Sequence, residues 1–413
     1  MDVHFYKRTA TMRKFIGLLV LALLGALSVP AMGATPEETA NEVLAKSPII
    51  DGHNDTPEKI REMFGNDFSK FDLANISPEQ LAKMHTSIPA LRAGHVGGQF
   101  WSVWVDASLP KYEAVAQVTE QIDVVERMVA RYPDTFQLAR SSADVEAAMK
   151  KGKIASLIGM EGGHSIASSL GILRQMYRAG ARYMTITHSL NTEWADSSTD
   201  DPKNDGLSPF GFEVIAEMNR LGMIVDLSHV SEATMQDVLD KSTAPVLFTH
   251  SNARAITPHP RNVPDSVLKR LPQNGGVVMV TFVPGFTSPQ RREWDLLEAA
   301  ASARAYREFR GNPDGEKKAM EAWRSANPKP AATLAQVADM IDHIRKVSGI
   351  DHIGIGGDFA GVDELPVGLE NVSTYPALFA ELVRRGYSKA DLAKISQGNV
   401  LRVMRGVEKA AGK

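Results

Sequence analysis

Residues 223–250 read MIVDLSHVSEATMQDVLDKSTAPVLFTH, and this stretch contains two short apolar runs that each end in a histidine. The first run, MIVDLSH, ends at His229, and the second, APVLFTH, ends at His250. Near-continuous apolar runs of this length are typical of parallel strands that are covered on both faces. The ends of consecutive parallel strands lie side by side, so the two imidazoles are predicted to be spatial neighbours.

The same kind of run recurs along the chain and predicts the fold class. Stretches of helical period, such as residues 113–132 and 208–222, separate the runs. This alternation is typical of βα units and of a parallel sheet. Eight strands predict an α/β fold, a (β/α)8 TIM-type barrel in a single domain. The other six runs are PIIDGHND, GGQFWSVWV, IASLIGMEG, ARYMTITHS, GGVVMVTFV and HIGIGGDF.

One irregularity interrupts the alternation after the seventh strand. Residues 287–332 are charged, rich in alanine and predicted to be helical, and the stretch ends in Asn-Pro-Lys-Pro. An insert at the catalytic end of a barrel could cover the site as a lid. The alternative is an ornament on the outside of the barrel, and the sequence does not choose between them.

The first 33 residues have the pattern of a cleavable secretory signal. Four basic residues precede the apolar run FIGLLVLALLGALSV, and small residues follow it. The predicted cut is after Gly33, which divides the chain into a signal peptide (1–33) and a catalytic domain (34–413). A periplasmic or secreted protein is therefore expected. The run is short for a bilayer span, so a retained membrane anchor is the weaker alternative.

Charge and cysteine content exclude several classes of function. The chain has 413 residues, a formal charge of −3 and no cysteine, and removal of residues 1–33 changes the charge to −6. Such a balance offers no electrostatic reason to expect nucleic acid or an anionic membrane as a partner. Without cysteine there is no disulfide, no thiol catalysis and no lipid-modified N-terminal cysteine.

Histidine and acidic residues stand at the ends of several predicted strands. His53 and Asp55 are two apart, so their side chains share one face of the first strand. Alone, this spacing is more often a surface turn, but its place after a buried strand favours a site. Glu161 ends the third strand before two glycines, and a buried glutamate is costly unless it is paired or binds a cation. Together these residues favour a divalent metal site.

Three more histidines, His188, His229 and His250, end later strands. A single histidine in such a place is more often a solvated or capping residue, but two on adjacent strands beside carboxylates favour metal ligation. Imidazole and carboxylate without thiolate suit Zn²⁺ best, with Mn²⁺, Co²⁺ or Fe²⁺ as alternatives. The other histidines, including His164 and His259, are interpreted as structural or solvated.

Two further residues are candidates for chemistry. Asp358 ends the eighth strand in GIGGDFAG, where an aspartate suits general acid/base work beside an activated water. The glycines resemble a phosphate loop, but the spacing and the following Lys-Ser or Lys-Thr are missing. Arg261, after the sixth strand, is a plausible anchor for an anionic group, and its alternative is a surface arginine.

With these residues in this order, the chain resembles the renal (membrane) dipeptidase family, metallopeptidase family M19, within the amidohydrolase-like barrels. The resemblance implies two zinc ions, with His53 and Asp55 on one ion, His229 and His250 on the other, and Glu161 bridging both. It also implies that His188 steadies the oxyanion, Arg261 binds the substrate carboxylate and Asp358 transfers the proton. The matching segments are DGHNDTP, LRAGHVGGQFWSV, LIGMEGGHSI, TITHSLNTEWADSS, GMIVDLSHVS, FTHSNARAITPHPRNVPD, IGIGGDFAGV and QGNVLRVM.

The chain departs from mammalian relatives in two respects. Leu190 and Glu193 stand where those relatives have Cys and Pro, and Glu193 is close in sequence to His188, where it could alter side-chain preference. The mammalian disulfides and lipid anchor have no counterpart here. The resemblance therefore leaves undecided whether two copies of the chain form a homodimer. No stable membrane anchor is expected.

The expected function is zinc-dependent hydrolysis of dipeptides, by attack of a metal-bridging hydroxide on the peptide carbonyl. Within enzymes, the alternative is a related barrel that acts on another amide or a lactone. From another class, the alternative is a catalytically silent binding protein built on the same barrel. The sequence does not reveal the preferred dipeptide or the native metal.

Overall fold

The computed structural model describes residues 34–413, so the predicted signal peptide lies outside the described residues. Eight parallel strands form a closed barrel in the order β2-β1-β9-β8-β7-β6-β5-β4, and pairing of β2 with β4 closes it. This confirms the predicted (β/α)8 fold. The barrel strands are β1 (Ile49–Asn54), β2 (Val96–Trp104), β4 (Ile154–Glu161), β5 (Ala181–Thr185), β6 (Ile224–Asp226), β7 (Leu247–Phe248), β8 (Val277–Val280) and β9 (Ile353–Ile355).

The hydrogen-bonded strands are shorter than the apolar runs that predicted them. Strand β6 ends three residues before His229, β7 ends two before His250, and β5 ends three before His188. The histidines therefore stand on the first residues of the loops at the barrel mouth. These positions let the side chains turn toward the barrel axis, because the backbone there is no longer hydrogen-bonded to two neighbouring strands.

The sequence did not predict a ninth strand, β3 (Phe136–Leu138). It pairs only with the first residues of β4, where Phe136 lies opposite Ile154. Further along, β4 pairs with β5 instead. A strand of three residues is too short to show a hydrophobic period, which explains why the sequence pattern missed it.

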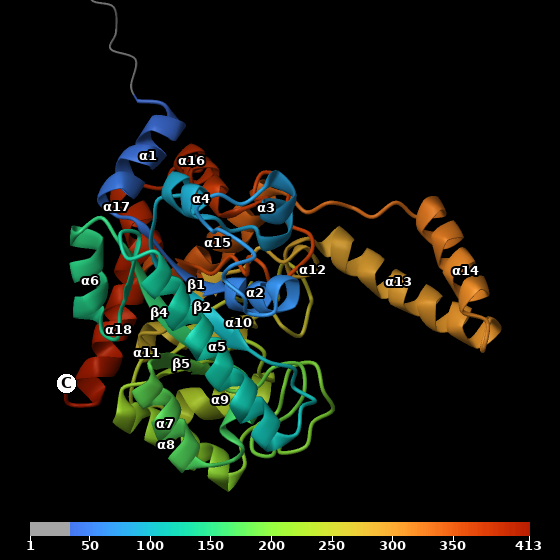
Figure 1. Cartoon of the computed structure of the whole chain (residues 1–413), viewed down its shortest axis with the longest axis horizontal. Coiled ribbons are helices and arrows are strands. Elements are labelled where there is room, and N and C mark those ends of the chain that lie inside the picture. Colours follow the sequence, from blue (N-terminus) through green and yellow to red (C-terminus); the bar gives the residue numbers. More distant parts are fainter. Residues whose placement is uncertain (1–33) are drawn as a thin grey trace, which may run out of the picture. The chain divides into compact units, whose positions relative to one another are not determined.

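Helices surround the barrel, as Figure 1 shows for residues 34–413. The longer ones are α1 (Pro36–Lys46), α5 (Lys111–Arg131), α7 (Leu170–Ala179), α8 (Pro209–Leu221), α9 (Glu232–Lys241), α15 (Leu334–Ser348), α16 (Tyr375–Arg384) and α18 (Asn399–Ala410). The shorter ones are α2 (Thr56–Phe64), α3 (Pro78–Met84), α4 (Ile88–Ala93), α6 (Ser142–Lys150), α10 (Asp265–Leu268), α11 (Leu271–Asn274), α12 (Pro284–Thr287) and α17 (Lys389–Ala393). Single 3₁₀ or π turns are η1 (Gly163–Ile166), η2 (Ile350–His352), η3 (Val372–Thr374) and η4 (Lys394–Gly398). Among these residues, no helix has the length and apolarity needed to cross a membrane.

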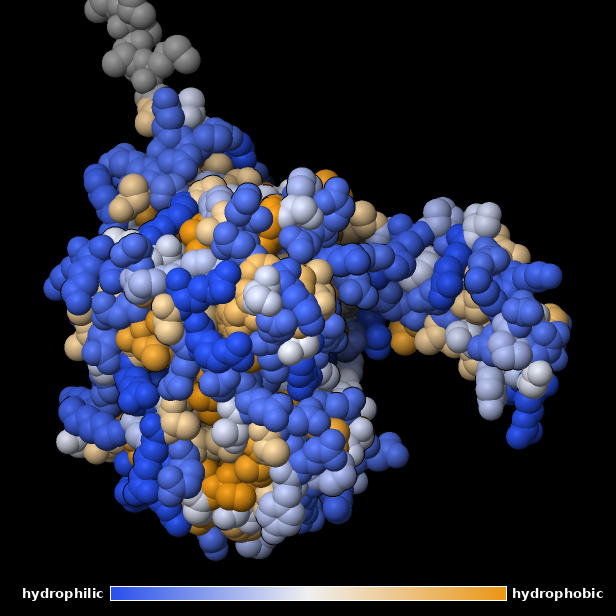
Figure 2. Space-filling view, in the orientation of Figure 1, coloured by the Kyte–Doolittle hydropathy of each residue, from blue (hydrophilic) through white to orange (hydrophobic). Residues whose placement is uncertain are grey.

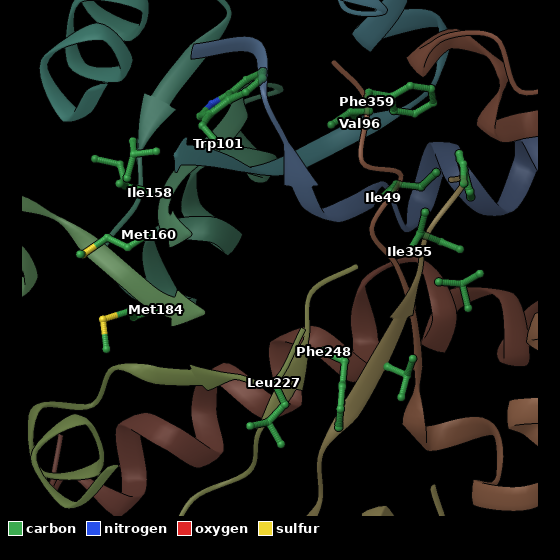
Figure 3. Close-up of a cluster of buried hydrophobic side chains, with 14 of the residues drawn as sticks. Ile49, Val96, Trp101, Ile158, Met160, Met184, Leu227, Phe248, Ile355 and Phe359 are labelled. Carbon is green, nitrogen blue, oxygen red and sulfur yellow. The ribbon is translucent and has the colours of Figure 1, made fainter. Parts of the chain in front are cut away.

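Alternate residues of the strands fill two parts of the core, because successive side chains point to opposite faces of a strand. Phe248 and Ile355, drawn in Figure 3, belong to the large cluster that packs against the helices. Phe100 and Tyr183 belong to a second buried cluster. Burial of each such side chain contributes roughly 1.5–3 kcal/mol. This packing gives the strand ends a rigid frame.

The insert after strand seven forms two helices, α13 (Pro289–Glu308) and α14 (Pro313–Ala326), and we call this hairpin the arm. The predicted helical content is thus confirmed. The arm extends away from the barrel (Figure 1), and its visible surface in Figure 2 is mostly hydrophilic. Trp294 packs against Trp323 with ring centroids 5.5 Å apart and joins the two helices. The arm is therefore neither a lid over the barrel nor an ornament packed along its side.

Candidate metal centre

A cavity of about 230 Å³ lies at the mouth of the barrel, and the end of every barrel strand contributes to its wall. This is the face on which TIM-barrel enzymes build their active sites. All eight predicted site residues lie in or beside this cavity. The lining residues are Asp55, Glu58, Trp104, Glu161, His188, His229, His250, Arg261, Val283, Phe286, Asp358, Gly361 and Val362.

The five predicted ligands form two groups on either side of Glu161. On one side, His53 Nε2 lies 3.3 Å from Glu161 Oε2 and 3.4 Å from Asp55 Oδ2. On the other side, Nε2 of His229 and Nε2 of His250 lie 3.0 and 3.3 Å from Glu161 Oε1. Each oxygen of the Glu161 carboxylate thus faces one group of donors, which is the arrangement a bridging ligand requires.

The protonation states suit metal ligation. Burial holds the pKa values of His229 and His250 well below the usual range, so both imidazoles are neutral and can offer a lone pair. Burial alone would raise the pKa of Glu161, but His53, His229 and His250 outweigh it and hold that pKa well below its usual range. Burial alone would lower the pKa of His53, but Tyr183, Glu161 and Asp55 outweigh it and raise that pKa well above its usual range, so this imidazole would lose its proton on binding a cation. The cluster therefore combines an ionised carboxylate with two neutral imidazoles and a third that a cation would deprotonate.

Among residues 34–413, three buried atoms of these ligands have no hydrogen-bond partner: His53 Nε2, Asp55 Oδ1 and His229 Nδ1. An unsatisfied buried polar atom costs roughly 1–3 kcal/mol. The donor atoms of His53, Glu161 and His250 lie within 4.8 Å of one another, as do those of His53, Asp55 and Asp358. Divalent cations would satisfy these atoms, so the residues present fit a binuclear metal site.

Two buried residues that the sequence did not single out position His53. The hydroxyl of Tyr183 lies 2.9 Å from His53 Nδ1, so the Nε2 atom is left facing Asp55 and Glu161. The backbone N–H of His53 donates to Asp51 Oδ1 at 2.8 Å. Tyr183 fits because residue 159 is a glycine. In any other residue, the Cβ at this position would lie 2.0 Å from the tyrosine ring. Such contacts orient metal-ligating histidines.

A second set of buried hydrogen bonds orients His250. The hydroxyls of Thr185 and Thr249 donate to Asp226 Oδ2 at 2.6 and 2.7 Å, and Thr249 Oγ1 lies 3.0 Å from His250 Nδ1. These contacts join β5, β6 and the residues after β7. Threonine is common in strands and a single aspartate carries no pattern, so only the pairing of the strands reveals their role.

Arg261 is buried, with 3% of its surface exposed, and the alternative of a surface arginine is wrong. Its Nη2 donates to His250 O at 3.4 Å, whereas Nε and Nη1 have no partner among the described residues. Burial lowers the pKa of the guanidinium to about 10, which still leaves it charged at neutral pH. A buried cation with free donors in a cavity wall is suited to an anionic group of a ligand.

Asp358 lies beside His53 and Asp55, with Oδ1 3.9 Å from His53 Nε2. Burial, reinforced by Asp55 and Glu161, raises the pKa of Asp358 to about 8, near the value that acid/base catalysis at neutral pH requires. Its φ of 60° is in the left-handed region, a strained conformation that recurs at functional sites. A Cβ on residue 361 would lie 2.4 Å from Asp55 Oδ2 and 2.5 Å from Asp358 Oδ1, so Gly361 gives room to the two carboxylates.

His188 stands at the rim beside the metal cluster, with Nε2 4.0 Å from Glu161 Oε1. Burial lowers its pKa, and its ring lies 5.3 Å from that of Trp104. Glu193, in contrast, does not line the cavity, because its carboxylate is bound by Lys111 at 2.6 Å and Ser168 at 2.7 Å. The structure gives no support to an influence of Glu193 on the substrate.

Comparison with known proteins agrees with this site. Residues 37–413 match the family described as membrane dipeptidase (peptidase family M19). The chain is 43% identical over 416 residues to an uncharacterised dipeptidase of Schizosaccharomyces pombe. The matched region covers 97% of this chain and 91% of that relative.

Solved structures show the same fold. A probable dipeptidase of Pseudomonas aeruginosa, PvdM, superimposes with a TM-score of 0.78 at 24% identity, over 91% of this chain and 99% of that one. A metallopeptidase of Rhodobacter sphaeroides, solved with a phosphinate mimic of the dipeptide L-Ala-D-Ala, has a TM-score of 0.71 at 23% identity, over 87% and 99%. At such identities the similarity concerns the fold alone.

Proposed function

Because the chain belongs to the membrane dipeptidase family, peptidase family M19, and is thereby a metal-dependent enzyme that hydrolyses dipeptides, we propose that it works with two zinc ions. His53 and Asp55 would hold one ion, His229 and His250 the other, and Glu161 would bind both. Neutral imidazoles and carboxylates without thiolates are a donor set that Zn²⁺ prefers. When bound, the ions supply Lewis-acid activation of a water molecule and of the substrate carbonyl.

Arg261 binds the C-terminal carboxylate of the substrate in this proposal. Its Nε and Nη1 are free among the described residues, and either can act with the second N–H of Nη2 to offer two parallel donors to a carboxylate. Burial strengthens the ion pair because water is excluded. His188, on the far side of Glu161, donates a hydrogen bond to the carbonyl oxygen as negative charge develops there. The dipeptide is thus held at its C-terminal carboxylate and at the carbonyl oxygen of the scissile bond.

Asp358 carries the proton between the attacking water and the leaving amine. Its raised pKa allows both forms of the carboxyl near neutral pH, so it can accept a proton and then return it. The same carboxyl is 3.9 Å from Nε2 of His53, a proposed ligand of the first ion, and this distance supports a role beside the reacting atoms.

The observation that carries the proposal is the buried guanidinium of Arg261 beside the ligand cluster. A hydrolase of neutral amides or lactones has no need of it, and a silent binding protein has no need of Asp358 with a raised pKa. Activity should be measured on Ala-Ala, Ala-Ala amide and Ala-Ala-Ala, together with the metal content of the protein.

We expect zinc-dependent cleavage of Ala-Ala and at least roughly tenfold lower kcat/KM on the other two, since hydrogen bonds to charged groups are worth roughly 1.5–3 kcal/mol. Equal rates on the dipeptide and its amide would move the function to another amide. Bound metal without hydrolysis of any of the three would favour the binding protein.

The N-terminal segment supports a further part of the proposal, export to the periplasm or secretion. It rests on the sequence of residues 1–33 alone, with its basic residues, apolar run and small residues before the predicted cut. N-terminal sequencing of the mature protein should begin at Ala34. An intact N-terminus on the purified protein would exclude this cut.

A further inference from the structure

Glu58 is a fourth carboxyl in the wall of the cavity, and neither the metal ligands nor the proton transfer uses it. It lies in the first turn of α2, one turn after Asp55. Its side chain is 13% exposed, so most of it is shielded from water. A shielded carboxyl at the mouth of a catalytic cavity requires an explanation.

Within residues 34–413, Glu58 has no close partner. The nearest cation is Arg61, whose Nη2 lies 3.6 Å from Glu58 Oε1, beyond good hydrogen-bond distance. Arg61 is also held elsewhere, since its Nη1 donates to Gln117 Oε1 at 3.1 Å. Burial, reinforced by Asp55 and Glu62, raises the pKa of Glu58 to about 8. The ionised carboxylate is therefore costly unless a cation arrives.

The place of Glu58 in the barrel shows which part of a substrate it would meet. Arg261 bonds to the backbone of His250, just after β7, whereas Trp104 ends β2. In the order of the eight strands, β2 is opposite β7, and β1, which precedes Glu58, is next to β2. A dipeptide held by its carboxylate at Arg261 and by its carbonyl near Glu161 thus extends its N-terminal residue toward Trp104 and Glu58.

We propose that Glu58 and Trp104 form a subsite for a cationic side chain on the N-terminal residue of the dipeptide, a lysine or an arginine. The inference rests on the dipeptidase function proposed above. A carboxylate and an aromatic ring are the two groups that recognise an ammonium or guanidinium. Trp104 lines the cavity, and the carboxylate of Glu58, which among residues 34–413 has only the long ion pair with Arg61, gains a closer partner.

A structural role is the alternative. An acidic residue in the first turn of a helix interacts favourably with the helix dipole, and Glu58 also stands three residues before Arg61. A purely structural Glu58 would affect all dipeptides alike. Selectivity between two dipeptides therefore separates the two roles.

The test compares kcat and KM on Lys-Ala and Met-Ala, because both carry the same N-terminal ammonium and long unbranched side chains. The unmutated enzyme should prefer Lys-Ala, and Glu58→Gln should lower the ratio of kcat/KM values by roughly ten- to a hundred-fold, the range for a charged hydrogen bond. The change should be mainly in KM, since the side chain does not touch the scissile bond.

Two further variants complete the design. Glu58→Lys should reverse the preference in favour of Glu-Ala over Lys-Ala. Glu79→Gln is the matched control, because Glu79 also stands in the first turn of a helix, α3, is exposed and does not line the cavity. Its ratio should equal that of the unmutated enzyme.

An unchanged ratio in Glu58→Gln, or an equal loss on Lys-Ala and Met-Ala, would overturn the subsite. Failure of the unmutated enzyme on every dipeptide would instead contradict the proposed function. The two failures are thus distinguishable.

Discussion

The mouth of the barrel and the arm differ in almost every physical respect. At the mouth, polar side chains are buried, and hydrogen bonds from neighbouring strands orient them, as Tyr183 does for His53. In the arm only Trp294, Ala305 and Met320 are buried, and Leu296, Leu297 and Tyr306 are more than half exposed. The strand ends form a rigid site, whereas the arm adds little to the core of the barrel.

Only the root of the arm comes near the site. Arg291 and Lys329 bind Glu364 at 2.6 and 2.7 Å, shortly after Gly361 and Val362 in the cavity wall. Glu364 is 47% exposed, and ion pairs to an exposed carboxylate are typically worth at most about 1 kcal/mol. The site should therefore respond strongly to changes at the mouth and weakly to changes in the arm, and the predictions below test this contrast.

The largest effect is expected from Glu161→Ala. The change removes a donor from both groups of ligands, so metal content and dipeptide hydrolysis should fall together. Metal analysis of the purified variant and its activity with added Zn²⁺ are the measurements. Two tightly bound ions in this variant would show that Glu161 does not bridge them.

Asp358→Asn should lower kcat by about 10²–10⁴-fold, because asparagine keeps the shape but cannot transfer a proton. Metal content should stay at the level of the unmutated enzyme. A kcat within a few-fold of that enzyme, with metal bound, would assign the proton to another group.

Arg261→Ala should lower kcat/KM on free dipeptides by roughly ten- to a hundred-fold, since a charged hydrogen bond is lost. Amidated dipeptides should be hydrolysed about as poorly as before. Arg261→Lys should restore little, because an ammonium cannot make two parallel hydrogen bonds to a carboxylate. Retained discrimination between free and amidated dipeptides in Arg261→Ala would disprove the assignment.

A smaller effect concerns the stability of the metal-free protein. Folding raises the pKa of Glu58 from 4.5 to about 8, so the folded state binds the proton more tightly than the unfolded state. The stability contributed by Glu58 therefore falls as pH rises through this window, on the order of a few kcal/mol at most. When a chelator has removed the metal, the melting temperature of Glu58→Gln should be higher than that of the unmutated protein at about pH 8. At about pH 5 the two melting temperatures should be equal. A difference between the two melting temperatures that grows toward low pH would contradict this prediction.

The smallest effect is expected from removal of the arm, with residues 290–329 replaced by a short flexible linker. The arm lends no residue to the cavity wall and few to the core, so kcat/KM on dipeptides and the melting temperature should change little. A large fall in kcat/KM with an intact fold would show that the arm acts on the site.

Much of the site could be predicted because its residues stand at recognisable places in the sequence. His53, Asp55 and Glu161 end or directly follow long apolar runs, and a parallel barrel brings such ends together. Asp226 and Thr249 could not be found in this way, since they act through hydrogen bonds between strands that only the sheet order brings together. Glu58 also escaped notice, because an acid in the first turn of a helix usually has a local explanation.

The sequence by itself determined the eight-stranded barrel and the metal-binding character of its mouth, because burial on both faces of a strand leaves a continuous apolar run. It also determined that the insert is helical. Only the tertiary structure decided that Arg261 is buried with free donors, that Glu58 faces the cavity and that the arm points away from it. These properties depend on which side chains surround a residue, and packing between distant segments sets that environment.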